Sequence, residues 1–235
     1  MNIILFDKEE RTFVKTDERY QHLKKVLHVS CGSEFKGGEI NGQAGVATIT
    51  HFDEDCLTFE FKIEEDASAL HPITLILGQV RPICMRRILR ESVSLGVERL
   101  LLVISDLGEK SYSNATLYTD GTYESILLDG AMQSGKTGVT KVEFYSSVDE
   151  VLKTELTGDK LLLDPRKGMD RLSKFPFNSK TTVLAIGPER GWSEREINLF
   201  LKNNFTPLLM GDRILRTETA VVTAISLSLA GMNLI

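Results

Sequence analysis

The stretch that decides the fold runs from Leu184 to Ala220. It opens with Leu-Ala-Ile-Gly-Pro-Glu-Arg-Gly-Trp-Ser (184–193) and closes with Gly-Asp-Arg-Ile-Leu-Arg-Thr-Glu-Thr-Ala (211–220). Each segment follows a short apolar run, at 181–186 and 206–210, and a glycine ends each predicted strand. Between the two strands, Ser193 and Glu196 form the pattern of a capping box, which predicts a helix that ends at 203–204. We expect Thr217 to cap a long final helix.

A strand, a helix and a second strand predict a βαβ unit, in which the two strands are parallel. Both loops then lie at the carboxyl ends of the strands, where open α/β sheets bind their ligands. The loops carry five charged side chains beside the glycines, and this arrangement suits a polar ligand. Ordinary polar turns are the alternative. The charged residues are Glu189, Arg190, Arg213, Arg216 and Glu218.

The composition indicates a globular protein of one or two domains. The 235 residues are 42% hydrophobic and 26% charged, with a net charge of −5. This charge argues against a general polyanion binder but leaves room for a local basic cleft. The cysteines Cys31, Cys56 and Cys84 lack metal or redox spacing, so we expect free thiols, no metal and a cytoplasmic location. The apolar run at the start is too short for a signal peptide, and the apolar end, 220–235, is shorter than a membrane span.

The charge and pattern change near residue 70. Residues 1–70 hold 8 Lys and Arg against 14 Asp and Glu, whereas residues 71–235 hold 20 against 19. In the first part, short alternating runs separated by glycines predict a small β-barrel after a helix over 20–29. The second part alternates strands and helices, which predicts an α/β domain with a largely parallel sheet. Its expected strands are 73–77, 100–104, 142–145 and 160–163, and its expected helices are 82–95, 118–134 and 148–156.

Residues 130–137, Gly-Ala-Met-Gln-Ser-Gly-Lys-Thr, match the phosphate-binding P-loop pattern letter for letter. That loop works only after a strand and before a helix, where glycine amides cradle a phosphate. Here a predicted helix precedes the match and a predicted strand follows it. We therefore interpret Gly135 as a helix C-cap, with Lys136 directed at a nearby cleft, and rank a P-loop NTPase last among the possible functions.

Several motifs together resemble the RsmE-type ribosomal RNA methyltransferases of the SPOUT superfamily, over essentially the full chain. The strongest, Gly211 to Ala220, is similar to the family signature Leu-Gly-x-Arg-Ile-Leu-Arg-Thr-Glu-Thr-Ala from its glycine onward, with Met210 in place of the leucine. Ile186 to Glu189 is similar to the first half of the Gly-Pro-Glu-Gly-Gly loop, in which Arg190 replaces a glycine. Shorter matches are His22-Leu23, Val26-Leu27 and Gly32, then Leu95-Gly96-Val97 and Gln133-Ser134.

The resemblance implies a PUA-like RNA-binding barrel at 1–70 and a SPOUT methyltransferase domain with a trefoil knot at 71–235. It implies a homodimer that binds S-adenosyl-L-methionine in the knot loops and methylates N3 of a uridine in small-subunit (16S) ribosomal RNA, free or in the assembled subunit. Glycine amides can contact the adenine and the amino-acid end, and apolar side chains can flank the adenine. Carried onto this chain, the cofactor shell is Leu163, Ile186, Gly187, Glu189, Gly191, Met210, Gly211, Ile214, Leu215, Arg216, Thr217 and Ala220.

Methylation of a base nitrogen needs alignment of donor and acceptor, and it needs removal of the N3 proton or stabilisation of the anion. We expect Arg216 to hold phosphate or the developing charge, with Glu189 or Glu218 orienting it; a structural ion pair or cap is the alternative for each glutamate. A solvated surface is the alternative for the expected RNA contacts, which are Arg81, Arg86, Arg87, Arg90, Lys136, Arg166, Lys167 and Arg190. Two other functions stay open: a SPOUT methyltransferase with a different RNA site, and a catalytically silent RNA-binding or ribosome-assembly protein.

Overall fold

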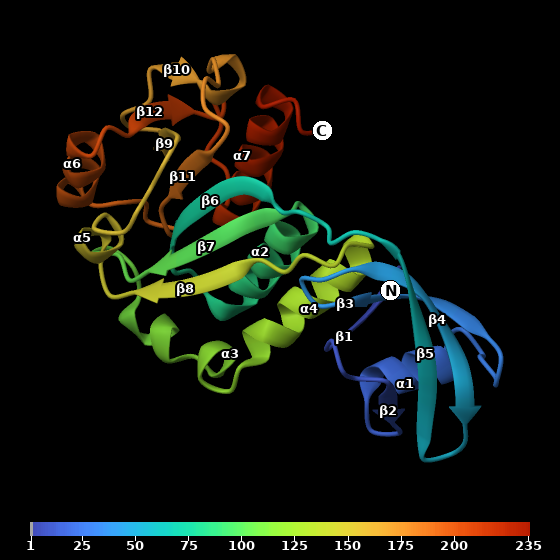
Figure 1. The fold of residues 1–235 in the computed structure, drawn as a ribbon. Helices are drawn as coiled ribbons and strands as arrows, with labels where there is room; N and C mark the ends of the chain where they lie inside the picture. The colour runs from blue at the N-terminus through green and yellow to red at the C-terminus, as the bar shows by residue number, and fades with distance from the viewer. Residues whose placement is uncertain (1) are drawn as a thin grey trace. The chain divides into compact units, whose positions relative to one another are not determined.

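The computed structural model describes residues 2–235, which separate into two compact units. The first consists of residues 2–69 together with 128–139, and the second of residues 70–127 together with 140–235. Figure 1 shows the chain coloured from its N-terminus to its C-terminus. A segment from the middle of the chain therefore belongs with the N-terminal unit, which the order of motifs along the sequence does not reveal.

The first unit is a curled five-stranded sheet in the order β1-β3-β4-β5-β2, with one helix. Its core is aromatic: Phe6 stacks against Phe59 and Phe61 at 5.0 Å between ring centroids, and Phe13 lies 5.1 Å from Phe59. The alternating burial of the strands directs these rings inward. The elements are β1 (Ile4–Phe6), β2 (Thr12–Val14), α1 (Glu18–Lys25), β3 (Glu34–Glu39), β4 (Ala44–Phe52) and β5 (Cys56–Glu65).

Helix α1 is shorter than the predicted helix over 20–29. The Asp17 side chain caps its start by accepting from the Arg19 amide, and Tyr20 and Leu23 face the core. Val26 and Leu27, which lie within the predicted helix but beyond the end of α1, are exposed. The helix ends at Lys25, and the chain then enters the left-handed region at His28, with φ +51°.

The structure of segment 128–139 excludes a P-loop. Helix α4 (Thr122–Ser134) precedes Gly135, which has φ +75° and ends the helix as predicted, and strand β8 (Lys141–Tyr145) follows. The Thr137 hydroxyl, which would hold magnesium in a P-loop, is buried and accepts from the Ser68 amide at 3.1 Å. The order helix–loop–strand is the reverse of a phosphate-binding loop, so the literal match is a coincidence of sequence.

The second unit contains a seven-stranded sheet whose pairings are all parallel, in the order β10-β12-β9-β11-β6-β7-β8. This confirms the predicted parallel α/β domain. The remaining strands are β6 (His71–Gly78), β7 (Val97–Val103), β9 (Asp159–Leu163), β10 (Asp170–Arg171), β11 (Thr182–Ile186) and β12 (Thr206–Leu209). The helices are α2 (Pro82–Ser94), α3 (Thr116–Thr119), α5 (Val148–Val151), α6 (Glu194–Lys202) and α7 (Thr217–Gly231), with short 3₁₀ turns at Lys110–Asn114 and Leu172–Lys174.

Helices cover both faces of this sheet (Figure 1). On one face, Ile76, Leu101 and Ala185 pack with Trp192 and Phe200 from the side of α5 and α6. Neighbouring strand residues point the opposite way, toward α2 and α7, which contact β7 and β11. The central strands are therefore continuous apolar runs, as expected of a parallel sheet buried on both sides.

Three sequence predictions in this unit need correction. The helix predicted over 118–134 is two helices, because Gly121 has φ +75° between α3 and α4. The helix predicted over 148–156 is the single turn α5. Thr217 is the first residue of α7 rather than its cap, and the cap position belongs to Arg216. Across residues 2–235, every helix is too short or too polar to span a bilayer.

Candidate functional site

Three loops leave the sheet at one edge. Strand β9 lies between β11 and β12, and Leu163 aligns with Ile186 on one side and with Leu208 on the other. Because the three strands are parallel, the loops that follow them open at the same edge. The two loops of the deciding stretch therefore lie at the same edge of the sheet, as predicted, although β9 separates their strands. The sequence order of strands does not show that β9 stands between them.

The loop after β11 is a tight turn that its glycines make possible. A Cβ atom on Gly187 would lie 2.8 Å from the backbone of Gly191, so only glycine fits there. The Gly191 amide donates to the Pro188 carbonyl at 2.8 Å, and Gly191 has φ +71°. Arg190 is exposed and its φ is not positive, so the turn accepts an arginine at that position. The chain then runs into the buried Trp192.

An arginine clamp holds this loop to the loop after β9. The Arg166 guanidinium donates to both carboxylate oxygens of Asp164, at 3.1 and 2.7 Å, and to the Trp192 carbonyl at 2.7 Å. The Asp164 side chain is 2% exposed, whereas that of Arg166 is 44% exposed. Sequence reasoning missed Asp164, for which the only signal was the Asp-Pro step at the end of a strand. The clamp fixes two of the three loops relative to each other.

The start of α2 lies against the same loop. One Glu189 carboxylate oxygen accepts from the Arg81 amide at 3.2 Å, at the N-cap of α2. Burial raises the pKa of the Cys84 thiol, and the negative charges of Glu218 and Glu189 raise this pKa further. Both predicted catalytic glutamates therefore lie near the first turn of α2. Glu189 also has a structural task there, since it satisfies a backbone donor at a helix start.

The loop after β12 joins Met210 to α7 without regular structure. Gly211 has φ +152°, and a Cβ atom there would meet nothing within 4 Å. Ile214 is a large apolar side chain that is 90% exposed and takes no part in the core. Arg216 is exposed at the N-cap of α7, and in the span 2–235 no carboxylate forms an ion pair with it. Thr217 and Ala220, also in the predicted cofactor shell, are buried on the helix.

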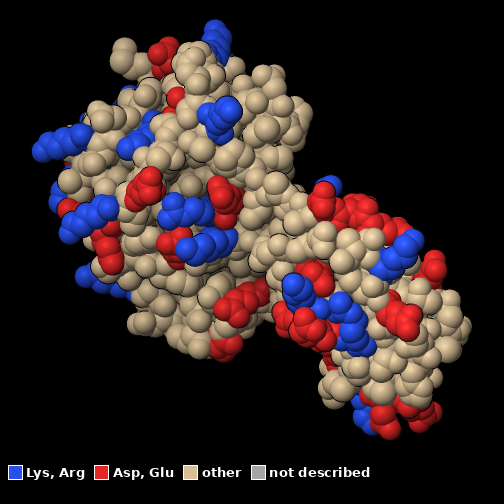
Figure 2. Space-filling model, in the orientation of Figure 1, with Lys and Arg blue, Asp and Glu red and all other residues tan. Residues whose placement is uncertain are grey.

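The predicted RNA contacts differ in how much of each side chain is exposed and in the bonds that it makes within the protein. Arg166 is held by Asp164, and Lys167 forms an exposed ion pair with Glu194 at 3.0 Å. The Arg81 side chain donates to the Tyr112 hydroxyl at 3.3 Å. The other predicted RNA contacts, Arg86, Arg87 and Arg90 on α2, Lys136 in the first unit and Arg190 in the loop after β11, are exposed. Basic and acidic atoms are interleaved on the face shown in Figure 2.

The predicted capping box of α6 is present and belongs to a larger network. The Ser193 hydroxyl accepts from the Glu196 amide at 3.1 Å, and Glu196 accepts from the Ser193 amide at 2.8 Å. Arg195 donates to Asp106 and to Asp149, and its hydrogen bond is the main cause that lowers the pKa of Asp106. Burial of Glu196 raises the pKa of that carboxyl. The link from α6 to the 105–108 turn could not be predicted, because it joins residues almost ninety positions apart.

Glycine-rich loops at the carboxyl edge of a parallel sheet, with charged side chains beside them, are typical of α/β proteins that bind a polar ligand. A family model described as an RNA methyltransferase domain matches residues 67–229. The ribosomal RNA small subunit methyltransferase E of Treponema pallidum is 38% identical to this chain, covering 99% of the chain and 92% of the relative. The ribosomal RNA small subunit methyltransferase E 1 of Borreliella burgdorferi is 31% identical, and the match covers 95% of this chain and 95% of the relative.

The fold agrees with these sequence relatives. The crystal structure of a ribosomal RNA small subunit methyltransferase E from Neisseria gonorrhoeae, bound to S-adenosyl methionine, has a TM-score of 0.79 to this chain at 26% identity. The match covers 98% of this chain and 97% of the chain in that crystal structure. The chain belongs to the ribosomal RNA small subunit methyltransferase E family. The family and the SPOUT-type fold class predicted from the sequence are confirmed.

Proposed function

We propose that this chain transfers a methyl group from S-adenosyl-L-methionine to N3 of a uridine in small-subunit (16S) ribosomal RNA. One observation carries the proposal: the family signature at 211–220 lies on a loop at the same sheet edge as the glycine turn 187–191. Full-length relatives with a methyltransferase name, and a solved relative bound to S-adenosyl methionine, support the reaction and the cofactor.

The residues at this edge fit S-adenosyl-L-methionine. Gly187 is buried and packs against the backbone of Gly191, which makes the turn compact, and the open space at Gly211 leaves a stretch of backbone accessible. Leu163 and Ile186 are paired neighbours at the ends of β9 and β11, and Ile214 is an exposed apolar side chain. Backbone amides suit the polar ends of the cofactor, and these aliphatic side chains suit its adenine. The remaining proposed contacts are Glu189, Gly191, Met210, Leu215, Arg216, Thr217 and Ala220.

The bound cofactor supplies a methyl group made electrophilic by its sulfonium. Arg216, at the start of α7 and without a carboxylate partner in residues 2–235, stabilises the negative charge on the uracil or holds its phosphate. Glu218, in the first turn of the same helix, orients Arg216. Glu189 positions the 187–193 loop against α2 through the Arg81 amide. The uridine must be unpaired or flipped to reach the site.

RNA binding is shared between the two domains in this proposal. Arg81, Arg86, Arg87, Arg90, Lys136 and Arg190 contact phosphates, and the PUA-like domain at 1–70 binds the surrounding RNA. Arg166 and Lys167, which also form ion pairs with Asp164 and Glu194, add phosphate contacts from the loop after β9. The chain acts in the cytoplasm as a homodimer, in which a second copy covers exposed apolar side chains such as Ile83 and Ile214. Sedimentation equilibrium would detect the dimer.

The test of the reaction is incubation with labelled S-adenosyl-L-methionine and small subunits from a strain that lacks this gene. We expect label on a small-subunit uridine. Label on another RNA would favour a SPOUT methyltransferase with a different site, and cofactor binding without label would favour a silent RNA-binding or assembly protein.

The test of the catalytic assignment is Arg216→Ala. Arg216 makes no side-chain cap and no ion pair in residues 2–235, so its loss leaves the fold largely intact. The variant keeps the backbone at position 216, through which we expect the cofactor contact, so cofactor binding is kept as well. We expect the methylation rate to fall about 100- to 1,000-fold, as for the loss of one donor to a developing anion. Calorimetry with the cofactor provides the control. A variant that methylates at the normal rate would remove Arg216 from the mechanism.

A further inference from the structure

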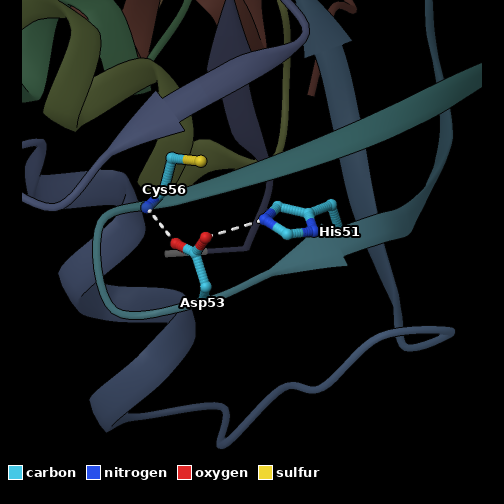
Figure 3. A group of neighbouring side chains, drawn as sticks. All are labelled: His51, Asp53 and Cys56. Carbon is cyan, nitrogen blue, oxygen red and sulfur yellow. Dashed lines mark hydrogen bonds and ion pairs between the residues drawn. The ribbon is translucent and has the colours of Figure 1, made fainter.

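Three side chains with different metal-ligand atoms converge at the turn between β4 and β5, in the first unit. His51 follows a bulge near the end of β4 and pairs with Thr58, Asp53 lies in the turn and Cys56 begins β5. One ligand atom from each residue, the imidazole nitrogen, a carboxylate oxygen and the thiol sulfur, lies within 4.8 Å of the other two. Figure 3 shows Asp53 between His51 and Cys56. The methyltransferase site uses none of the three.

Hydrogen bonds hold the turn in shape and already join two of the ligand atoms, His51 Nε2 and Asp53 Oδ2, to each other. Asp53 Oδ1 accepts from the amides of Asp55 and Cys56, both at 2.8 Å, and this fixes the carboxylate (Figure 3). The second oxygen, Oδ2, faces His51 Nε2 at 2.8 Å. The Tyr20 hydroxyl donates to the Asp53 carbonyl at 2.6 Å, which ties the turn to the buried core. The hairpin therefore presents the three side chains from a rigid base.

We propose that His51, Asp53 and Cys56 bind one divalent transition-metal ion of the zinc class. Imidazole nitrogen, carboxylate oxygen and thiolate sulfur are the donors that zinc accepts, whereas calcium and magnesium require oxygen ligands. Three protein ligands leave a fourth tetrahedral position, which water fills at this exposed turn. The spacing of the cysteines along the chain could not show this site, because only one cysteine takes part and the hairpin brings the other ligands to it.

The rearrangement needed for coordination is small. In a tetrahedral zinc site with ordinary bond lengths, neighbouring ligand atoms lie roughly 3.4 to 3.6 Å apart. The contact from His51 to Asp53 must therefore open by less than about 1 Å, and the Cys56 sulfur must turn toward the pair. On coordination the thiol releases its proton to solvent, and the imidazole binds in its neutral form.

Cobalt substitution tests the site on the full chain, kept reduced with a phosphine that does not bind metal. We expect one Co²⁺ per chain, with a thiolate-to-cobalt charge-transfer band that Zn²⁺ abolishes by displacement. Cys56→Ser removes the band, and His51→Gln weakens Zn²⁺ binding in calorimetry by about tenfold or more. Cys31→Ser is the matched control, because it removes an exposed thiol of the same unit and leaves the triad intact.

A second readout separates a metal site from a damaged hairpin. Zn²⁺ should raise the unfolding temperature of the wild type and of Cys31→Ser, and should leave that of Cys56→Ser unchanged. Absence of the charge-transfer band in the wild type would overturn the proposal. So would Cys56→Ser and His51→Gln variants that bind Zn²⁺ as tightly as the wild type does. Neither readout depends on methyltransferase activity.

Discussion

Replacing Arg166 with alanine removes the clamp between the loops after β9 and β11. The change strands the Asp164 carboxylate, which is 2% exposed, and removes the donor to the Trp192 carbonyl. Breaking a fully buried ion pair costs about 3–5 kcal/mol. Because the Arg166 side chain is 44% exposed, water reaches the vacated space, and we expect about 2–3 kcal/mol. For a domain of this size that is a fall of about 5–10 °C in unfolding temperature.

The assay uses the single tryptophan of the chain, Trp192, which is buried in the clamped loop. Its emission should shift to the red at lower temperature in Arg166→Ala than in the wild type, and cofactor affinity should fall. Lys167→Ala is the control, since its exposed ion pair with Glu194 contributes no more than about 0.5 kcal/mol. Adding Asp164→Asn to Arg166→Ala should restore part of the loss, because no buried charge is then stranded. A single variant that unfolds within about 1 °C of the wild type would refute the clamp.

Three further predictions concern the same edge of the sheet. Gly187→Ala should cost about 2 kcal/mol or more in urea unfolding and weaken cofactor binding, because its Cβ would lie 2.8 Å from backbone. Gly211→Ala meets no neighbouring atom, so it should cost only the backbone strain of φ +152°. Ser193→Ala should cost about 1 kcal/mol by removing the cap of α6, and an unchanged midpoint would contradict this. Arg195 lowers the pKa of Asp106, so this contribution to stability is present above the ordinary value of 3.8 and is lost as pH falls through the lowered pKa. Asp106→Asn should therefore lower stability at neutral pH, and the difference from wild type should shrink as the pH falls from about 5 to about 2.

Sequence patterns predicted correctly those features that depend on contacts within one helical turn. The capping box at Ser193 and Glu196 formed as predicted, and Gly135 ended its helix as predicted, because each depends on neighbours within one turn. The parallel sheet followed from alternating strands and helices. By contrast, the chain around Gly121 and His28 bends at single backbone positions, which the spacing of apolar residues does not register.

Contacts between distant segments were beyond the sequence. Asp164, a buried carboxylate, depends on Arg166 and on the Trp192 carbonyl from another loop. The position of β9 between β11 and β12 decides which loops are neighbours at the edge of the sheet. Local periodicity in the sequence does not predict the order of strands in a sheet. The residues of the proposed cofactor shell were placed by resemblance to a family motif rather than by physical patterning, and their individual roles stay predictions.

The most direct measurement is the nucleoside composition of 16S ribosomal RNA from a strain without this gene, complemented with wild type or with Arg216→Ala. Mass spectrometry of digested RNA distinguishes a uridine methylated at N3 from other methylated nucleosides. We predict that wild type restores an N3-methylated uridine in the small-subunit RNA and that Arg216→Ala does not, although it accumulates and binds S-adenosyl-L-methionine. The absence of that nucleoside from RNA complemented by an abundant wild-type protein that binds the cofactor would contradict the central claim.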